Sequence, residues 1–550
     1  MQPVSGEDAM RDFSDWTVIH LVRRQAAKLG EKTYLTFDTG LELTYAGLDR
    51  RSDDLAAALA GAGIGEGDRV LVLVKNRAEF MVALFGIMKA GAVFVPVNTE
   101  LRGAFLQHQL QNSDPKAVLV DIDLVHHFEG VDRGEAKPAH VVVVGGPPPA
   151  ELPEALLGAE ISSFDDFEAT GRGRTPPAVE PGIHDLAAII YTSGTTGPAK
   201  GVLLPHGHFY VWMDRQLAKL GQTADDVYYI CMPLFHVNAL NLQCLGTMMA
   251  GGRAHVVQRF SPNRWLDEVI ETGATITNLL GVMPEFVFNT PPTDRDRDHR
   301  LRMVTAVPIS KEWGAAMEQR FGFKIVQGFG MTECGMTALG DVNESGLEPG
   351  CAGYIDDEFY EVRIADPETD WPLGTDEVGE LLIRPKFPGI FSAGYYRMPE
   401  KTVEAWRNLW FHTGDACRID ARGRLHYVDR IKDCIRRRGE NISAFEVEQV
   451  INAHPAIAES AVVGVKVEGA GGEEEVMAVI VETPGRSVEP KELLDYCAPR
   501  MPRYAVPRFV RRIAELDKTA SGKLRKGDLR DAGVTTDTWD RESIGYVVQR

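Results

Sequence analysis

Residues 68–97 read DRVLVLVKNRAEFMVALFGIMKAGAVFVPV, and this stretch indicates the fold class. Its first part, 68–74, is a short apolar run rich in valine, which is typical of a buried β-strand. Residues 77–90 then carry apolar side chains at helical spacing, and residues 92–97 form a second apolar run. A strand, a helix and a strand in so short a cycle indicate a βαβ unit in a parallel sheet.

The same alternation continues on both sides of a polar interval rich in Gly and Pro (145–181). Before it, residues 101–112 have a helical pattern and residues 117–120 are strand-like. After it, six further strands are predicted, most of them separated by helical stretches: 186–191, 227–231, 254–257, 275–279, 303–307 and 324–327. These patterns predict one large α/β domain that contains two βαβ-type sheets.

The pattern changes after about residue 340. Short strands over 350–366 and 377–384 predict a small antiparallel β subdomain, and a compact α+β module follows residue 432. The residues after about 531 are expected to be loosely held. We therefore predict a large N-terminal domain and a small, mobile C-terminal domain, with these bounds: 1–430 for the large domain, about 1–180, 181–340 and 341–430 for its subdomains, and 431–550 for the small domain.

Charge divides the chain at the same place. The 550 residues have a formal net charge of −20, with 44% hydrophobic and 25% charged residues, which is an ordinary globular composition. Residues 431–550 contain 19 Lys and Arg against 20 Asp and Glu, so almost all of the excess acidity lies in residues 1–430. Nucleic acid is not an expected partner, because binding its phosphates needs a basic surface.

No targeting or membrane signal is apparent. Residues 1–16 are polar and acidic, unlike a secretory signal, and the apolar stretch 80–97 is interrupted by Lys89 and Gly91. The seven cysteines include no CxxC pair, so they favour neither a disulfide framework nor a zinc ribbon. We expect a cytoplasmic protein with reduced thiols and no membrane span. The sequence leaves the oligomeric state open, and a homodimer is compatible with it.

One loop has the composition of a phosphate-binding site. The strand 186–191 leads into TSGTTGPAKG at 192–201, which offers hydroxyls, backbone N–H groups and one lysine to a single anion. A flexible linker is the alternative, but a linker needs neither the preceding strand nor the lysine. The loop is not a P-loop of the GxxxxGK[ST] kind, because Lys200 is followed by glycine. It therefore predicts phosphate binding without indicating which bond is broken.

This loop resembles the signature loop of the adenylate-forming superfamily, which comprises acyl-CoA synthetases, nonribosomal peptide adenylation domains and firefly-type luciferases. Further motifs occur in the family's order: GFGMTE at 328–333, WFHTGD at 410–415, DRIKD at 429–433 with GEN at 439–441, and TASGK at 519–523. In this family ATP is cut at the α-phosphate to give an acyl-adenylate and pyrophosphate, and coenzyme A then displaces AMP. The resemblance implies an ATP- and Mg²⁺-dependent carboxylic acid:CoA ligase that acts on a small-molecule acid.

The resemblance also implies roles for single residues in the nucleotide site. Phe329 would stack on adenine, Thr332 would contact the phosphate, and Glu333 would hold Mg²⁺. Asp415 would bind the ribose hydroxyls, and Lys523 would stabilise the charge that develops when the carboxylate meets the α-phosphate. The full nucleotide-binding set implied is Thr192, Ser193, Gly194, Thr195, Thr196, Lys200, Gly328, Phe329, Gly330, Met331, Thr332, Asp415, Arg430 and Lys523.

For two of these carboxylates, the residues alone also allow a purely structural role. Glu333 fits a carboxylate at a helix start, where the helix dipole would stabilise it. Asp415 follows Thr413 and Gly414, and an aspartate in such a turn is usually structural.

The other implied roles concern the acid and coenzyme A. His236 would be a catalytic residue that gates the acyl pocket, which residues 236–244, 278–283 and 328–336 would line; a histidine satisfied within the core is the alternative. Lys432 would be the hinge about which the small domain rotates. The implied CoA-binding residues are Arg438, Gly439, Glu440 and Asn441, although the arginine run 436–438 also fits a solvated face.

Two features bear on the branch of the family. Residues 305–308 read TAVP where the family usually has a small-residue turn against adenine, and together with 296–302 they resemble the carnitine/crotonobetaine-CoA ligase subgroup more closely. Residues 235–242 contain no aspartate that could pair with a substrate amine. Transfer of the acyl group to a carrier protein or an amine remains the main alternative. A non-catalytic nucleotide-binding module is disfavoured, because Glu333, Asp415 and Lys523 are all present.

Overall fold

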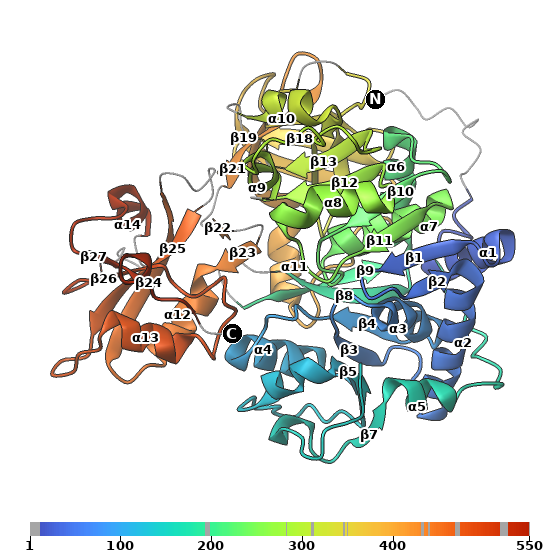
Figure 1. Ribbon diagram of the computed structural model, residues 1–550. Coiled ribbons are helices and arrows are strands. Elements are labelled where there is room, and N and C mark those ends of the chain that lie inside the picture. Colours follow the sequence, from blue (N-terminus) through green and yellow to red (C-terminus); the bar gives the residue numbers. More distant parts are fainter. Residues whose placement is uncertain are drawn as a thin grey trace.

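The computed structural model describes residues 12–192, 198–281, 283–307, 309, 313–344, 347–348, 350–430, 434–437, 440–467, 474–516 and 526–548. A large domain fills the centre and right of Figure 1, and a small domain, coloured orange to red, lies on the left. Three seven-stranded sheets form the large domain. The predicted fold class, a large α/β domain followed by a small α+β domain, is confirmed.

The first sheet contains the βαβ unit on which the fold prediction rests. Its strands, in the order β7-β6-β5-β3-β4-β8-β9, are β3 (Arg69–Leu73), β4 (Val93–Pro96), β5 (Ala117–Asp121), β6 (His140–Val144), β7 (Glu160–Ser163), β8 (Leu186–Thr192) and β9 (Lys200–Pro205). All neighbours are parallel except β8 and β9. Val70 and Val72 pack in one hydrophobic cluster and Leu71 and Leu73 in another. Both faces of β3 are therefore buried, which explains its continuous apolar run.

Helices flank this sheet, and one of them explains an interrupted apolar stretch. They are α2 (Tyr45–Gly61), α3 (Ala78–Lys89), α4 (Gly103–Ser113), α5 (Phe164–Ala169) and the 3₁₀ turns η1 (Ile122–Phe128) and η2 (Glu154–Leu156). Lys89 at the end of α3 is fully buried, and its ammonium donates to Asp49 (2.6 Å) and Asp53 (2.7 Å). The stretch 80–97 is therefore a core helix and strand, as predicted. No helix in the described ranges is long and apolar enough to cross a membrane.

The second sheet has the order β14-β13-β12-β10-β11-β1-β2. Its strands are β1 (Thr33–Phe37), β2 (Glu42–Thr44), β10 (Val227–Ile230), β11 (Arg253–Val256), β12 (Ile276–Leu280), β13 (Met303–Val307) and β14 (Lys324–Val326). The helices around it are α1 (Val18–Leu29), α6 (His206–Leu220), α7 (Gly246–Ala250), α8 (Pro262–Thr272), α9 (Met283–Phe288), α10 (Gly314–Phe321) and the π-helix η3 (Asn238–Leu245).

Strand exchange corrects the predicted subdomain boundaries. β1 and β2, from the first 180 residues, complete the second sheet through the parallel pairing of β1 with β11. β8 and β9, which follow residue 180, complete the first sheet instead. Strands join whichever sheet edge offers unpaired N–H and C=O groups, so sequence proximity does not determine the partner.

The third sheet is antiparallel and begins before residue 341. Its order is β15-β16-β17-β21-β20-β19-β18, with β15 (Gly328–Met331), β16 (Gly335–Leu339), β17 (Cys351–Ile355), β18 (Tyr360–Ala365), β19 (Gly379–Pro385), β20 (Phe411–Ile419) and β21 (Arg424–Arg430). α11 (Pro399–Ala405) and η4 (Arg407–Leu409) lie between β19 and β20. The GFGM part of the 328–333 motif is thus itself the first strand of this sheet.

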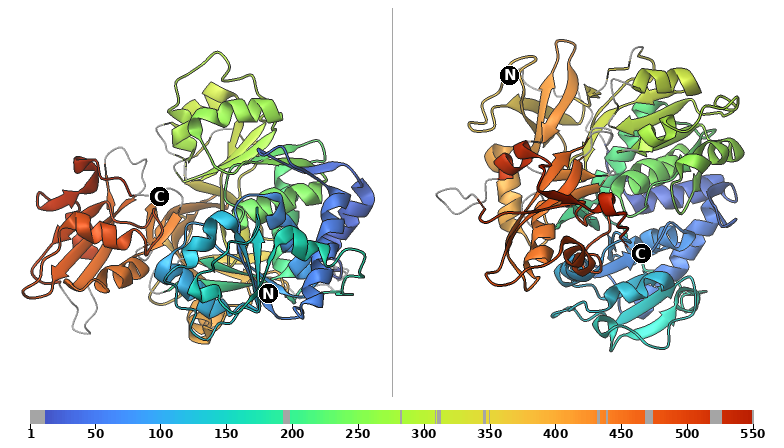
Figure 2. Two further views of the ribbon diagram at one scale, coloured as in Figure 1. Left: turned by 60° about the horizontal axis from the view of Figure 1, so that its bottom comes forward. Right: turned by 60° about the vertical axis from the view of Figure 1, so that its left-hand side comes forward.

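The small domain has a core of its own. It comprises β22 (Cys434–Arg437), β23 (Glu440–Ser443), β24 (Ile457–Lys466), β25 (Glu474–Glu482), β26 (Phe509–Arg512), β27 (Thr538–Asp540), α12 (Ala444–Asn452), α13 (Pro490–Cys497), α14 (Lys526–Ala532) and η5 (Arg541–Ile544). The expectation of a loosely held tail is wrong for the described residues after 531. β27 pairs with β26, and Val548 is buried in the domain core. Figure 2 shows this domain from two further sides.

Candidate active site

The glycine-rich loop connects two antiparallel strands. Thr192 ends β8 and Lys200 begins β9, and the two are cross-strand partners. β8 itself lies parallel to β4 in the interior of the first sheet. Four predicted phosphate-binding residues, Ser193, Gly194, Thr195 and Thr196, lie outside the described residues. The hairpin nevertheless brings both ends of the loop, and the lysine, to one place at the end of the sheet.

Glu333, the predicted metal ligand, is buried and linked to Lys200 through a tyrosine. Tyr395 donates its hydroxyl hydrogen to Glu333 Oε1 (3.0 Å), and the ammonium of Lys200 lies 4.2 Å from the centroid of the Tyr395 ring. Burial, together with the negative charge of Glu333, raises the pKa of Tyr395. Tyr395 therefore stays a hydrogen-bond donor that orients the carboxylate. The sequence analysis missed it, because it lies in no motif.

The segment that carries Glu333 is a turn between two strands and not the start of a helix. Residues 332–334 connect β15 to β16, so the helix-start reading of Glu333 does not apply. A Cβ at Gly330 would lie 2.8 Å from the carbonyl oxygen of Gly335, so the close pairing of these strands requires glycine there. Phe329 is only 8% exposed and packs in the hydrophobic cluster of the third sheet. Its stacking on adenine stays a prediction.

A buried histidine that no motif predicted supports this turn. Nε2 of His208, in α6, lies 3.0 Å from the carbonyl oxygen of Thr332, and Nδ1 lies 3.2 Å from the carbonyl oxygen of Ile390. Burial lowers the pKa of His208 to about 4. The ring is therefore neutral near pH 7 and can donate to one of these carbonyls at a time. It connects the Thr332 turn to the segment that leads to Tyr395.

Asp415 lies within β20, opposite Arg430 in β21. The two residues are Cα partners in the antiparallel ladder, so the predicted ribose-binding pair is adjacent along the backbone. Asp415 is 1% exposed, and the preceding Gly414 has φ +72°, which favours glycine. The N–H of Gly414 donates to Glu380 Oε1 (3.0 Å). The structure therefore places Asp415 in a bulged strand held by a second carboxylate.

Glu380 is a further residue that the sequence analysis missed. Its Oε2 lies 3.0 Å from Nδ1 of His412 and 3.0 Å from Nη2 of Arg407. Burial would raise the pKa of Glu380, but the hydrogen bonds and charges of its partners lower it overall. Glu380 is thus a charged anchor for the strand segment that presents Asp415.

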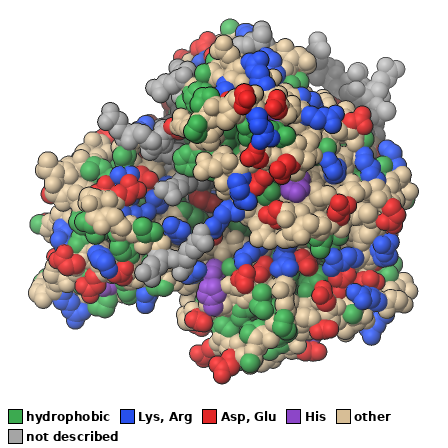
Figure 3. Space-filling model, in the orientation of Figure 1, with side chains coloured by type: hydrophobic (Ala, Val, Ile, Leu, Met, Phe, Trp, Pro, Cys, Tyr) green, Lys and Arg blue, Asp and Glu red, His purple; other side chains and the backbone are tan. Residues whose placement is uncertain are grey.

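His236, the predicted acyl gate, faces the small domain. Its side chain is 37% exposed, which does not fit a satisfied core histidine, and its Nε2 lies 3.4 Å from Oε1 of Glu440 in β23. A second contact joins the domains where Asn98 donates to the hydroxyl of Tyr504 (3.1 Å). The structure therefore brings one predicted CoA-binding residue to the predicted acyl site. Figure 3 shows the hollow between the two domains, with Lys and Arg side chains along its edge.

A π-helix with a buried polar network follows His236. Nδ2 of Asn278 and Nε2 of Gln243 both donate to Oδ1 of Asn238 (3.0 and 2.8 Å), and the hydroxyl of Tyr228 donates to Asn278 (2.6 Å). π-Helices are rare and frequently occur at functional sites. Parts of the predicted acyl-pocket segments 236–244 and 278–283 thus contact each other.

The remaining predicted positions divide into two groups. Lys432, Arg438, Gly439 and Lys523 lie outside the described residues. Asn441 is in β23, where its backbone pairs with Arg436, and the described residues 305–307 form the end of β13. Arg437 is buried, and its Nε lies 2.7 Å from Oε2 of Glu475, so this member of the arginine run is structural rather than part of a solvated face.

Comparison with known proteins identifies the family. The sequence model of the AMP-binding enzyme family matches residues 22–396. The sequence model of the AMP-binding enzyme C-terminal domain matches residues 446–523. The chain therefore belongs to the AMP-binding enzymes, the adenylate-forming superfamily. A crotonobetaine/carnitine–CoA ligase from Salmonella typhi is 30% identical over 520 residues, which cover 92% of this chain and 97% of the relative. The predicted enzyme class, an AMP-forming acid–CoA ligase, is confirmed.

Solved structures confirm the fold. An o-succinylbenzoate CoA synthetase double mutant from Bacillus subtilis matches with a TM-score of 0.77 and 24% identity, over 93% of this chain and 98% of that one. An amide bond synthetase from Marinactinospora thermotolerans also matches with a TM-score of 0.77 and 24% identity, over 93% and 99%. The fold is thus shared by proteins named for different acyl acceptors, and the fold alone does not determine the acceptor.

Proposed function

We propose that this chain converts a small carboxylic acid into an acyl-adenylate and then transfers the acyl group to coenzyme A. The contact between Glu440 and His236 is the observation that supports the transfer to coenzyme A. It places a residue of the implied CoA-binding segment against the implied acyl gate. Thioester formation needs the incoming thiol to reach the acyl carbonyl, and this contact joins the two regions concerned.

In the first step, a carboxylate oxygen of the acid attacks the α-phosphorus of ATP, and pyrophosphate leaves. Lys523 would stabilise the charge that accumulates there, while Lys200 and the loop 192–201 would hold the phosphates. Glu333 fits Mg²⁺, because its Oε1 is oriented by Tyr395 and its Oε2 has no hydrogen-bond partner among the residues described. Bound Mg²⁺ would neutralise phosphate charge in this step.

In the second step, the thiolate of coenzyme A attacks the acyl carbonyl of the adenylate, and AMP leaves. Asp415 and Arg430 would keep hold of the ribose while His236 faces the acyl group. Glu440 would position the incoming thiol through its contact with His236, next to Arg438, Gly439 and Asn441. The small domain therefore supplies different residues to the two steps, Lys523 to the first and residues 438–441 to the second.

Glu440→Gln tests the second step. The amide keeps the size of the side chain but removes the charge that faces His236. We expect kcat/KM for coenzyme A to fall about tenfold, the size of one charge-assisted contact, with ATP–pyrophosphate exchange within about twofold of wild type. Glu492→Gln, an exposed carboxylate of α13 in the same domain, is the matched control. A parallel loss of exchange activity would contradict a role confined to thioester formation.

Lys432→Pro tests the hinge. Proline fixes φ and would restrict rotation of the small domain at this position. We expect adenylation to be retained and thioester formation to be impaired, as measured by pyrophosphate exchange and by CoA thioester release. An unimpaired second step would place the hinge elsewhere.

The decisive assay for the overall reaction is mass detection of products from ATP, Mg²⁺, coenzyme A and a panel of aliphatic, aryl and betaine-like acids, carnitine included. A CoA thioester with AMP supports the proposal. ATP–pyrophosphate exchange without a thioester would instead favour transfer to a carrier protein or an amine. Absence of exchange with every acid would leave only nucleotide binding.

We further propose a cytoplasmic location. In the described part of the chain, six cysteines are free and buried, as in a reducing compartment. Enzyme assays on separated cell fractions would test it, and activity confined to a membrane or secreted fraction would contradict it.

A further inference from the structure

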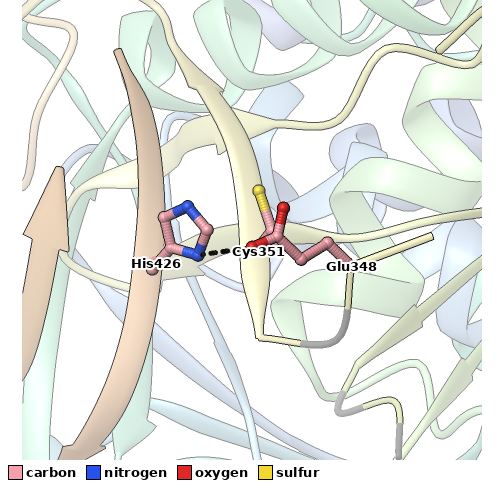
Figure 4. Close-up of side chains that lie close together, drawn as sticks. All are labelled: Glu348, Cys351 and His426. Atoms are coloured by element: carbon pink, nitrogen blue, oxygen red, sulfur yellow. Dashed lines mark ion pairs between the residues drawn. The ribbon is translucent and has the colours of Figure 1, made fainter. Parts of the chain in front are cut away.

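Three side chains with metal-binding atoms meet on the third sheet, outside the residues assigned to nucleotide, acid or coenzyme A. They are Glu348, Cys351 and His426, and each has one potential ligand atom within 4.8 Å of the others (Figure 4). Cys351 and His426 are Cα partners in the antiparallel pair β17–β21, so their side chains lie on the same face of the sheet. The N–H of Cys351 donates to the carbonyl oxygen of Glu348 (3.0 Å), and this hydrogen bond holds Glu348 beside Cys351.

The imidazole of His426 offers a lone pair to the other two side chains. Its Nε2 lies 2.9 Å from Oδ2 of Asp420, a carboxylate that can only accept, so Nε2 carries the hydrogen. Its Nδ1 lies 3.8 Å from Oε1 of Glu348, which is too long for a hydrogen bond. A histidine whose second nitrogen donates to a carboxylate is the usual arrangement of a metal ligand.

Arg424 binds one oxygen of the Glu348 carboxylate and leaves the other oxygen facing the cluster. Its Nη2 lies 2.8 Å from Oε2 of Glu348 and 2.8 Å from Oδ2 of Asp420. Oε1 of Glu348 is thereby left on the side of His426. With Cys351 as a thiol and a neutral imidazole, these five side chains carry a net charge of −1. A thiolate and a bound dication would bring the total to zero.

A second triad in the same sheet provides a contrast. Asp370, Glu380 and His412 also gather, but both ring nitrogens of His412 face acceptors, Glu380 Oε2 at 3.0 Å and the carbonyl of Arg407 at 3.2 Å. Each nitrogen of that ring thus already has an oxygen within hydrogen-bond distance. Glu380 is engaged by Arg407 and Gly414 as well. His426 therefore differs from His412 in having a ring nitrogen, Nδ1, that faces the cluster with its carboxylate beyond hydrogen-bond distance.

We propose that Glu348, Cys351 and His426 form a zinc site with water as the fourth ligand. A thiolate, an imidazole and a carboxylate suit Zn²⁺, whereas Mg²⁺ prefers oxygen ligands alone. Tetrahedral zinc places its ligand atoms about 3.3–3.8 Å apart, so the cluster would contract on binding. The side chain of Glu348 is 46% exposed, which gives access from solvent. Binding forms the Zn–S bond and releases the thiol proton of Cys351 to water.

The site would be structural. It joins the residues before β17 to β21, the strand that ends at Arg430 beside the proposed hinge. Zinc would stabilise the large-domain side of that connection, since a ligand that binds only the folded state raises its stability.

The test uses the full-length chain, stripped with a chelator and titrated with Zn²⁺ or Co²⁺ alone. We expect one Zn²⁺ per chain, a melting temperature that rises with Zn²⁺ concentration, and a Co²⁺–thiolate charge-transfer band. Cys351→Ser should abolish the band, and Cys417→Ser, a buried thiol in the neighbouring β20, should retain it. Asp420→Asn should weaken Zn²⁺ binding by about 10–100-fold, the usual cost of losing the carboxylate partner of a ligating histidine.

Two results would overturn the proposal. One is Co²⁺ binding to the wild-type chain without a thiolate band. The other is equal Zn²⁺ content in the wild-type chain and the Cys351→Ser variant, each shown to be folded by circular dichroism. The wild-type spectrum and the Asp420→Asn affinity do not depend on whether the cysteine variant folds.

Discussion

Lys523→Ala is expected to lower ATP–pyrophosphate exchange about 10²–10³-fold while coenzyme A still reacts with acyl-adenylate supplied from outside. The expected size is that of one preorganised donor removed from a developing anion. Joining a carboxylate to an α-phosphate brings two anions together, and this ammonium would lower that cost in the transition state. The thiol attack on a finished adenylate has no such requirement.

The described segment that follows Lys523 belongs to the small domain. α14 begins three residues after Lys523, and Nζ of Lys526 lies 2.6 Å from Oε1 of Glu448 in α12. The segment after Lys523 is thus anchored within the small domain, and it would travel with that domain. Figure 1 shows α14 on the outer part of the small domain, while β23 lies nearer the large domain. β23, which carries Glu440, is thus the part of the small domain that faces His236.

Two half-reactions measure the effect. Pyrophosphate exchange reports the first step, and CoA thioester formed from synthetic acyl-adenylate reports the second. Lys491→Ala is the control, because this lysine of α13 is 60% exposed and its ion pair is with Asp495 in its own helix. Equal loss of both half-reactions in the Lys523 variant would show that its role is not specific to adenylation.

Glu333→Gln is expected to lower adenylation about 10²-fold and to raise the Mg²⁺ concentration that gives half-maximal rate. Glutamine can still accept the hydrogen bond from Tyr395, so the variant removes the charge and leaves the local geometry in place. The loss is that expected when a carboxylate ligand of a catalytic cation becomes neutral. Pyrophosphate release measured over a range of Mg²⁺ concentrations at saturating ATP gives both quantities.

Tyr395→Phe is the matched comparison for this variant. It keeps the charge of Glu333 and the aromatic ring beneath Lys200, and it removes only the hydroxyl donor. We expect a loss of about tenfold, the size of one hydrogen bond to a charged group. A Glu333→Gln enzyme with the Mg²⁺ dependence of wild type would contradict the assignment of Glu333 to the metal.

Local strand and helix positions could be predicted wherever burial dictates the sequence. β13 was predicted at its observed bounds, and β3, α3 and β4 within one or two residues, because strands buried on both faces must be apolar throughout. Which edge each strand joins could not be predicted, since β1 and β11 are far apart in the chain. The strand β27, in the segment after residue 531, was not predicted for the same reason. Its residues are mostly polar, and it is held in place by pairing with β26.

The motifs identified several site positions but not their supports. Asp415 and Glu333 could be found from the residues around them. Tyr395, His208 and Glu380 could not, because the contacts described for each of them lie at least 27 positions away in the chain. A buried polar contact of this kind leaves no local periodicity, so only the folded chain reveals it.

Exchange of strands between the two parallel sheets has a consequence for synthesis on the ribosome. β1 and β2 leave the ribosome early, yet β1 finds its parallel partner β11 only after residue 256 has been made. At about 5–20 residues per second, that interval is about 10–40 seconds. During it, the apolar face of a nascent hairpin has no sheet to join, and this interval is where the growing chain depends most on protection from aggregation.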